Sequence, residues 1–227
     1  MADLTPPKAC VLIPAYNEEK NIGRVVHAVK DLGFPVLVVD DGSKDGTAEA
    51  ARAAGAEVLT PGKNQGKGTS LRLGTEWFLK RGNPVLVMMD ADGQHDAADL
   101  GLFLAALQDG ADLAVGDRMH KPERMPLVRV LTNRLMSWVI SLIARQRVPD
   151  SQCGYRAIRR EVLQKISLKT ARFEIETEII LEAARAGFRI ASVPIRSVYA
   201  GEESQIHPVR DTLRFVNFLA AYLISKK

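Results

Sequence analysis

Two carboxylates with one small residue between them are the clearest chemical feature of this sequence. Asp90 and Asp92 flank Ala91 directly after the apolar run 85–89. In a turn after a strand, both carboxylates can face one hard divalent cation, and Gln94 could add a neutral oxygen. A cation there would neutralise a diphosphate as it leaves. A solvated Asp-rich turn shows the same short motif, so its meaning depends on its neighbours.

Four further polar groups follow short apolar runs: Pro14–Glu19, Asp40–Thr47, Asn64–Gly68 and Gly116–Arg118. In the second group, Ser43 or Asp45 can cap the following helix while Asp41 accepts from the N–H of a nucleobase. In the third, Lys67 stands between two glycines at a helix start, which suits a phosphate. P-loop spacing is absent, and so is the glycine fingerprint of dinucleotide oxidoreductases after the first apolar run.

The elements that position these groups alternate between strands and helices, which predicts an α/β fold with a mostly parallel central sheet. Because ligands bind beyond the carboxyl ends of parallel strands, the five polar groups are expected to converge on one crevice. The predicted strands are 9–13, 36–39, 56–59, 85–89, 113–115 and 190–195, and the predicted helices are 19–32, 45–54, 67–80, 99–108, 127–144, 176–186 and 211–224.

The predicted helix 127–144 carries one narrow polar stripe, because Arg129, Asn133, Ser137 and Ser141 recur every fourth residue. Most of its remaining circumference is apolar. Such a helix can lie in the plane of a membrane surface, or it can be a core or dimer helix. The preceding segment, 117–126, is rich in charge and proline and is predicted to be a loop.

Charge is divided unevenly between the two halves of the 227 residues. Residues 1–115 hold 11 basic and 16 acidic side chains, and residues 116–227 hold 20 and 11. An acidic half suits a metal site, and a basic half suits phosphate groups or an anionic membrane. The basic residues do not alternate with aromatic ones, so no nucleic acid is expected as a partner.

Two cysteines exclude a disulfide framework, and no N-terminal signal is visible. No uncharged apolar run reaches the roughly 18 residues of a spanning helix. The expectation is a cytoplasmic protein, peripheral on the cytoplasmic face of a membrane. The oligomeric state is left open.

In their order along the chain, residues 14–18, 40–43 and 90–92 resemble the inverting glycosyltransferases of family 2, which have the GT-A fold. Residues 66–68, 94–95, 152–157 and 204–215 narrow the resemblance to the dolichyl- or polyprenyl-phosphate sugar transferase branch. The likeness covers nearly the whole chain as one domain. It implies a nucleotide-sugar half at 1–116 and an acceptor half at 117–227, with 127–144 and 211–224 as interfacial helices.

The resemblance also implies roles for single residues. The nucleotide sugar would be bound by Pro14, Ala15, Tyr16, Glu18, Asp40, Asp41, Lys67, Asp90, Ala91, Asp92, Arg118 and Arg210. Mg²⁺ or Mn²⁺ would be held by Asp90, Asp92 and Gln94. The acceptor phosphate would meet Arg129, Asn133, Arg134 and Ser137. Catalysis would rest on Asp90, Asp92 and Arg129.

Three departures from the branch pattern bear on these roles. Asp96 and Ala97 stand where two prolines are usual, Asp117 stands for a serine, and Gln205 for a lysine. The last two substitutions remove or offset positive charge near a phosphate.

The implied reaction transfers a sugar from GDP-mannose or a UDP-hexose to a polyprenyl or dolichyl phosphate. A phosphate acceptor is already ionised at neutral pH and needs no general base. The alternative is a saccharide hydroxyl acceptor, which requires a carboxylate base such as Glu174 or Glu176. A nucleotidyltransferase would carry a basic glycine-rich loop after the first strand, where Pro14–Asn17 stand instead. A catalytically silent binding module is disfavoured by the intact Asp90, Asp92 and Gln94.

Overall fold

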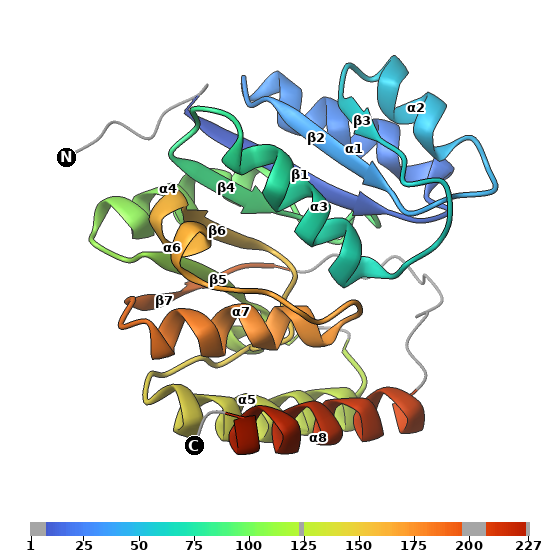
Figure 1. Ribbon diagram of the computed structural model, residues 1–227. Coiled ribbons are helices and arrows are strands. Elements are labelled where there is room, and N and C mark those ends of the chain that lie inside the picture. The colour runs from blue at the N-terminus through green and yellow to red at the C-terminus, as the bar shows by residue number, and fades with distance from the viewer. Residues whose placement is uncertain (1–7, 123–124, 197–207, 226–227) are drawn as a thin grey trace.

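One seven-stranded sheet organises the molecule, in the order β3-β2-β1-β4-β6-β5-β7 (Figure 1). The computed structural model describes residues 8–122, 125–196 and 208–225. The strands are β1 (Ala9–Ala15), β2 (Val36–Asp40), β3 (Glu57–Leu59), β4 (Val85–Met88), β5 (Leu113–Asp117), β6 (Arg156–Arg159) and β7 (Ile190–Pro194). β6 runs antiparallel between β4 and β5, and all the other pairs are parallel. The expected mostly parallel sheet is confirmed.

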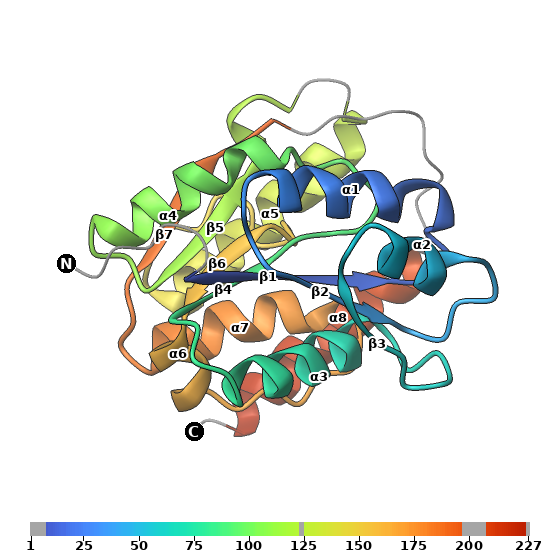
Figure 2. The ribbon, with the colours of Figure 1, turned by 90° about the horizontal axis from the view of Figure 1, so that it is seen from above.

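Helices cover both faces of this sheet (Figure 2). Their bounds are α1 (Glu19–Asp31), α2 (Thr47–Ala53), α3 (Lys67–Leu79), α4 (Leu100–Gln108), α5 (Leu127–Ala144), α6 (Arg160–Lys165), α7 (Glu174–Arg185) and α8 (Pro208–Ser225), with short 3₁₀ helices η1 (Ala97–Asp99) and η2 (Arg118–His120). α1 and α4 lie on one face, with α2 packed beside α1, and α3, α6 and α7 lie on the other. α5 and α8 run beneath α7 at one side of the molecule (Figure 1).

The central strands are apolar along their whole length because both of their faces are covered. Every residue of β2 and β4 is buried. Parallel strands covered by helices on both sides read as continuous apolar runs rather than alternating ones. This is why the sequence located these strands to within a residue or two.

Neither β6 nor α6 is predicted from the sequence, and η2 lies in the segment 117–126, which is predicted to be a loop. β6 pairs antiparallel with β4, placing Ala157 opposite Val87. Its four residues include two arginines, and Arg156 is 1% exposed. A short strand containing a buried arginine has neither an apolar run nor an alternating pattern, so periodicity could not reveal it.

Helix α5 turns its polar stripe toward the protein and its apolar face outward, which is the reverse of an ordinary surface helix. Asn133 and Ser137 of its polar stripe are each 2% exposed. Its large apolar residues face outward: Leu127, Val128, Leu131, Leu135, Trp138 and Leu142 are 58–80% exposed. α5 is also the one helix in the described ranges that is long and apolar enough to cross a membrane. Its stripe is bonded to the loop 148–151 and it packs on α7, so it lies along the body of the protein.

Candidate active site at the carboxyl edge of the sheet

The loops after β1 and β2 are joined by hydrogen bonds at the edge where the sequence predicts the nucleotide site. Asn17 N donates to Ser43 Oγ at 2.9 Å, and Lys44 N donates to Asn17 Oδ1 at 2.9 Å. Glu18 N donates to Thr47 Oγ1 at 2.8 Å. Of the predicted nucleoside contacts before them, Ala15 is buried at the end of β1, and Pro14 and Tyr16 are half-buried. The two loops therefore form one continuous wall.

The two aspartates at the end of β2, Asp40 in the strand and Asp41 directly after it, both hold backbone turns. Asp40 Oδ1 accepts from Ser43 N at 3.0 Å, closing its own loop. Asp41 accepts from Gln65 N at 2.9 Å and from Gly66 N at 2.7 Å, and it is 4% exposed. Asp41 thus fixes the turn that leads into α3.

The glycines beside Lys67 allow a close approach between two chain segments. A Cβ on Gly68 would lie 2.5 Å from the Ala171 carbonyl carbon, and one on Gly66 would lie 2.6 Å from the Ala171 oxygen. Thr69 N donates to that same oxygen at 3.2 Å. The segment 171–172 therefore covers the first turn of α3. At this helix start, which the sequence predicts to suit a phosphate, the Lys67 side chain is the remaining candidate for that contact.

Lys67 joins the strand edge to α7. Its Nζ lies 2.6 Å from Asp90 Oδ1 and 2.6 Å from Glu176 Oε1. Burial alone would lower the pKa of Lys67, but the charges of Asp90 and Glu176 raise it above its usual range. Lys67 is therefore a fixed cation among carboxylates.

Asp90 has a partner at each carboxylate oxygen. Besides Lys67 on Oδ1, His95 Nε2 lies 3.5 Å from Oδ2. Burial would raise the pKa of Asp90, but Lys67 and His95 lower it well below its usual range. A Cβ on Gly154 would lie 2.4 Å from Oδ2, so the loop before β6 closes over this carboxylate only because residue 154 is a glycine.

Asp92 is less strongly compensated. Its Oδ1 accepts from Gln94 N at 2.9 Å. Burial, followed by the charge of Asp90, raises its pKa. A divalent cation between the two aspartates would relieve this repulsion, and the oxygens of Asp90, Asp92 and Gln94 are the ligand type that Mg²⁺ and Mn²⁺ prefer. The side chains present fit such an ion, although the described residues contain no group of three His, Cys, Asp or Glu side chains arranged for a metal.

Arg118 and part of the polar stripe belong to a separate buried network. Arg118 donates to Asp150 through Nε at 2.7 Å and Nη2 at 3.0 Å, and it is 7% exposed. Asn133 Nδ2 donates to Asp150 Oδ1 at 2.9 Å. Ser137 Oγ donates to Asn133 Oδ1 and accepts from Ser151 N. These three residues, predicted to contact phosphates, hold α5 to the loop after it.

Two of the predicted acceptor contacts reach the surface of α5. Arg129 is half-buried and Arg134 is exposed. Arg210 falls in the first turn of α8, where the side chains lie outside the described part of the structure, as do residues 197–207.

From the sequence, Gly154 has no predicted role, and Glu176 is only one of two candidate bases for a saccharide hydroxyl acceptor. The available signal for Gly154 is that it lies in the segment 152–157, which in the sequence supports only the resemblance to the sugar transferase branch. Arg156 supports the same region, because it donates to the carbonyl oxygens of Cys153, Ser151 and Glu176. One buried arginine thus links the loop over Asp90 to the start of α7.

Comparison with known proteins identifies the family. The model of glycosyl transferase family 2 matches residues 10–167. The chain belongs to glycosyl transferase family 2. The match spans β1 to α6. It includes Lys67, Asp90, Asp92 and His95, which together with Glu176 are called the Asp90 cluster.

Named relatives extend the likeness over most of the chain. Glycosyltransferase AglJ of Haloferax volcanii is 36% identical over 91% of this chain and 69% of its own length. The polyprenol monophosphomannose synthase of Mycolicibacterium smegmatis is 35% identical over 83% of this chain and 76% of its own. A glucosyl-3-phosphoglycerate synthase of Mycobacterium tuberculosis, solved with Mn²⁺, UDP and its product, aligns with a TM-score of 0.73 at 20% identity, covering 97% of this chain and 80% of its own. This chain is a glycosyltransferase with the GT-A fold.

Proposed function

We propose that this glycosyltransferase transfers a sugar from a nucleotide sugar to the phosphate of a polyprenyl lipid, with inversion at the anomeric carbon. The observation that carries the proposal is the pairing of a carboxylate-rich edge, Asp90 and Asp92, with a helix that turns its apolar face outward. The first suits a nucleotide diphosphate, and the second suits an acceptor held in a membrane. The name of the Mycolicibacterium smegmatis relative supports the same acceptor class.

The donor diphosphate would lie over the Asp90 cluster. Mg²⁺ or Mn²⁺ held by Asp90, Asp92 and Gln94 would supply positive charge for the departing diphosphate. Lys67, held beside Asp90 at 2.6 Å, adds a fixed cation at the same edge. The wall formed by the loops after β1 and β2 would line the nucleoside, with the half-buried Tyr16 in the first of these loops.

The acceptor would provide its own nucleophile. An ionised phosphate oxygen of the lipid would form the new bond to the anomeric carbon as the bond to the nucleoside diphosphate breaks, so no proton has to be removed. Glu176, one of the two carboxylates considered as a base for a hydroxyl acceptor, is occupied by Lys67 at 2.6 Å. This arrangement disfavours Glu176 as the base that a saccharide hydroxyl would need.

The experiment is incubation with Mg²⁺ or Mn²⁺, radiolabelled UDP- or GDP-sugars and polyprenyl phosphate, followed by extraction. Label is expected in the organic phase. Transfer to a saccharide hydroxyl, with no lipid product from any donor, would overturn the proposal.

Arg129 is proposed to contact the acceptor phosphate. Because a hydrogen bond to a charged group contributes about 1.5–3 kcal/mol, Arg129→Ala should raise the KM for the lipid about tenfold or more and leave donor affinity unchanged. Arg52→Ala, on the surface of α2, is the matched control. Loss of donor affinity in Arg129→Ala would instead place this residue in the donor site.

We further propose that the protein works on the cytoplasmic face of a membrane as a peripheral protein. The outward apolar residues of α5 would enter the interface between headgroups and acyl chains. At the end of α8, Leu223 and Ile224 are also exposed, at 48% and 76%. Phe218 and Tyr222 of α8 instead pack against the core, so of these α8 side chains Leu223 and Ile224 are the ones that would touch lipid.

A further inference from the structure

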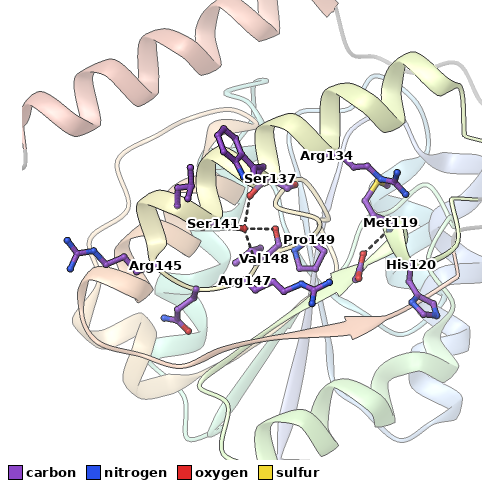
Figure 3. Close-up of a pocket in the computed structure, with 13 residues that line it drawn as sticks. Met119, His120, Arg134, Ser137, Ser141, Arg145, Arg147, Val148 and Pro149 are labelled. Carbon is purple, nitrogen blue, oxygen red and sulfur yellow. Dashed lines mark hydrogen bonds between the residues drawn. The ribbon is translucent and has the colours of Figure 1, made fainter.

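A basic pocket lies beside the outward apolar face of α5, and no residue of the Asp90 cluster lines it. Its volume is about 690 Å³, and it is bounded by η2, the second half of α5 and the turn that follows α5 (Figure 3). Its ionisable groups are Asp117, His120, Arg134, Arg145 and Arg147. The lining thus holds three arginines and one carboxylate, and one oxygen of that carboxylate accepts from Met119 N at 2.9 Å. The pocket therefore favours an anion.

The arginines differ in direction. Figure 3 shows Arg134 and Arg147 extending toward the end of the pocket that holds Met119 and His120, whereas Arg145 points away from it. All three are exposed. Two guanidinium groups can thus approach an anion inside the pocket, while the third adds positive charge at its rim.

The turn that carries Arg145 and Arg147 is braced rather than loose. Gln146 Nε2 donates to Phe188 O at 2.8 Å, and its Oε1 accepts from Ile190 N at 2.9 Å. Val148 N donates to Ser141 Oγ at 3.0 Å. Arg145 itself has a left-handed backbone with φ 53°, a conformation that favours glycine. The backbone that carries these arginines is therefore held in place, so less backbone freedom is lost when an anion binds.

The apolar neighbours of the pocket identify which anion fits. Trp138 and Leu142 line the pocket and also belong to the outward face of α5, at 60% and 58% exposure. An anion bound here would therefore sit at the border between a charged pocket and an apolar surface. A phospholipid phosphate has this arrangement, with its acyl chains on the apolar side.

We infer that this pocket binds the phosphate headgroup of an anionic membrane lipid and so sets how α5 lies on the bilayer. The inference rests on the proposed function at a membrane. Arg134 and Ser137, two of the predicted acceptor contacts, line the pocket, whereas Arg129 does not, so the headgroup site adjoins the acceptor contact proposed at Arg129 and differs from it in Arg145 and Arg147. Its occupant is a lipid of the bilayer, not the lipid that receives the sugar.

The test compares binding to vesicles of phosphatidylcholine alone and of phosphatidylcholine mixed with phosphatidylglycerol. The protein carries Trp77→Phe so that the fluorescence of Trp138, at the pocket wall, reports contact. Tighter binding and a blue shift are expected with the anionic vesicles. Because each basic residue near a charged surface contributes about 1 kcal/mol, Arg145→Gln with Arg147→Gln should weaken binding about fivefold per arginine.

The matched control removes the same charge from the opposite end of the molecule, with Lys30→Gln and Arg52→Gln on α1 and α2. It should change vesicle affinity less than twofold. If both double variants weaken vesicle binding equally, net charge rather than this pocket determines the affinity, and the inference is overturned. If inorganic phosphate without vesicles changes the fluorescence of Trp138 at the affinity seen with lipid, the ligand is a soluble anion, and the lipid assignment is overturned.

Sugar transfer in detergent micelles separates this inference from the proposed function. The double variant at Arg145 and Arg147 should keep wild-type transfer in micelles while losing affinity for anionic vesicles. If transfer is absent from the wild type but the vesicle result holds, the proposed reaction fails and the headgroup site stands. If transfer occurs and anionic lipid has no effect on binding, the headgroup site fails alone.

Discussion

A buried carboxylate, Asp150, and a partly buried one, Asp90, each lie beside a basic side chain, and the two clusters differ in how fully their charge is compensated. The side chain of Asp150 is 0% exposed, and it accepts hydrogen bonds from two side-chain nitrogens of Arg118 and from the amide of Asn133. Asp90 is 25% exposed, and its cation, Lys67, is shared with Glu176. With Asp92 nearby, the Asp90 cluster has more negative than positive charge.

We propose that this difference distinguishes a cluster that stabilises the fold from one that serves the reaction. A closed and neutral cluster has no unsatisfied group with which to bind a ligand, so its expected contribution is to stability. A partly exposed cluster with excess negative charge can accept a cation, so its proposed contribution is to function. The contrast makes opposite predictions for substitutions in the two places.

The largest expected effect on stability is at Asp150. Asp150→Ala leaves Arg118 buried without its carboxylate, which costs about 3–5 kcal/mol in the free energy of unfolding. Urea denaturation measures the loss. Glu49→Gln breaks an exposed pair with Arg52 and should change stability by less than about 0.5 kcal/mol. Equal and small losses for both would show that the Asp150 cluster is not structural.

The pH dependence of stability sharpens this first prediction. Burial would raise the pKa of Asp150, but Arg118 lowers it, and the net direction is downward. A folded pKa below the unfolded value of about 3.9 means that the stabilisation is present above that pH and is lost as the pH falls through the folded pKa. The wild type should therefore lose stability below about pH 4 more steeply than Asp150→Asn. Parallel acid profiles would contradict this assignment.

Asp92→Asn should have the next largest effect, on activity. Removing one carboxylate from the proposed metal site is expected to lower the transfer rate about a hundredfold or more. Stability should hold or rise, because burial and the charge of Asp90 disfavour ionised Asp92 in the folded state. Activity assays and melting curves measure both, with Asp109→Asn at the end of α4 as the control. A destabilised variant with normal activity would reverse the proposed roles of the two clusters.

Gly154→Ala tests the closure over Asp90. The added Cβ would lie 2.4 Å from Asp90 Oδ2, so the carboxylate must move. Since a misplacement of about 1 Å can reduce a rate up to a hundredfold, we expect a loss of about tenfold or more, with weaker Mn²⁺ binding by calorimetry. Gly101→Ala in α4 meets no atom within 4 Å and should instead stabilise the protein by about 0.5–1 kcal/mol. Full activity in Gly154→Ala would show that Asp90 tolerates the shift.

The smallest effect is expected on the outward face of α5. Leu131 is 66% exposed. Leu131→Gln should therefore change stability by less than about 0.5 kcal/mol while weakening vesicle binding. Val26→Gln on α1, where the valine is fully buried, should destabilise the protein by several kcal/mol. A large stability loss at Leu131 would mean that this face is covered in solution.

Much of the fold could be predicted from sequence because buried parallel strands and their helices have plain periodic patterns. The convergence of Asp41, Lys67 and Asp90 followed from the rule that parallel strands end at one edge. That rule gives the neighbourhood but not the partners. The contact between Lys67 and Glu176 joins residues 109 positions apart, and no local pattern records it.

The orientation of α5 shows a second limit of prediction from sequence. The sequence revealed a narrow polar stripe and a wide apolar face, but not which one turns inward. Burial of Asn133 and Ser137 depends on Asp150 and Ser151, which lie in the following loop and offer hydrogen bonds to the stripe. An amphipathic pattern alone is equally compatible with both orientations.

The most direct test of the central claim compares two acceptors that differ only in the phosphate, polyprenyl phosphate and the corresponding polyprenol, with a labelled nucleotide sugar that supports transfer. The account predicts a labelled lipid from the phosphate, none from the alcohol, and loss of the product when EDTA removes the divalent cation. Equal transfer to polyprenol would contradict a phosphate nucleophile, and undiminished transfer in EDTA would contradict the cation site at Asp90 and Asp92.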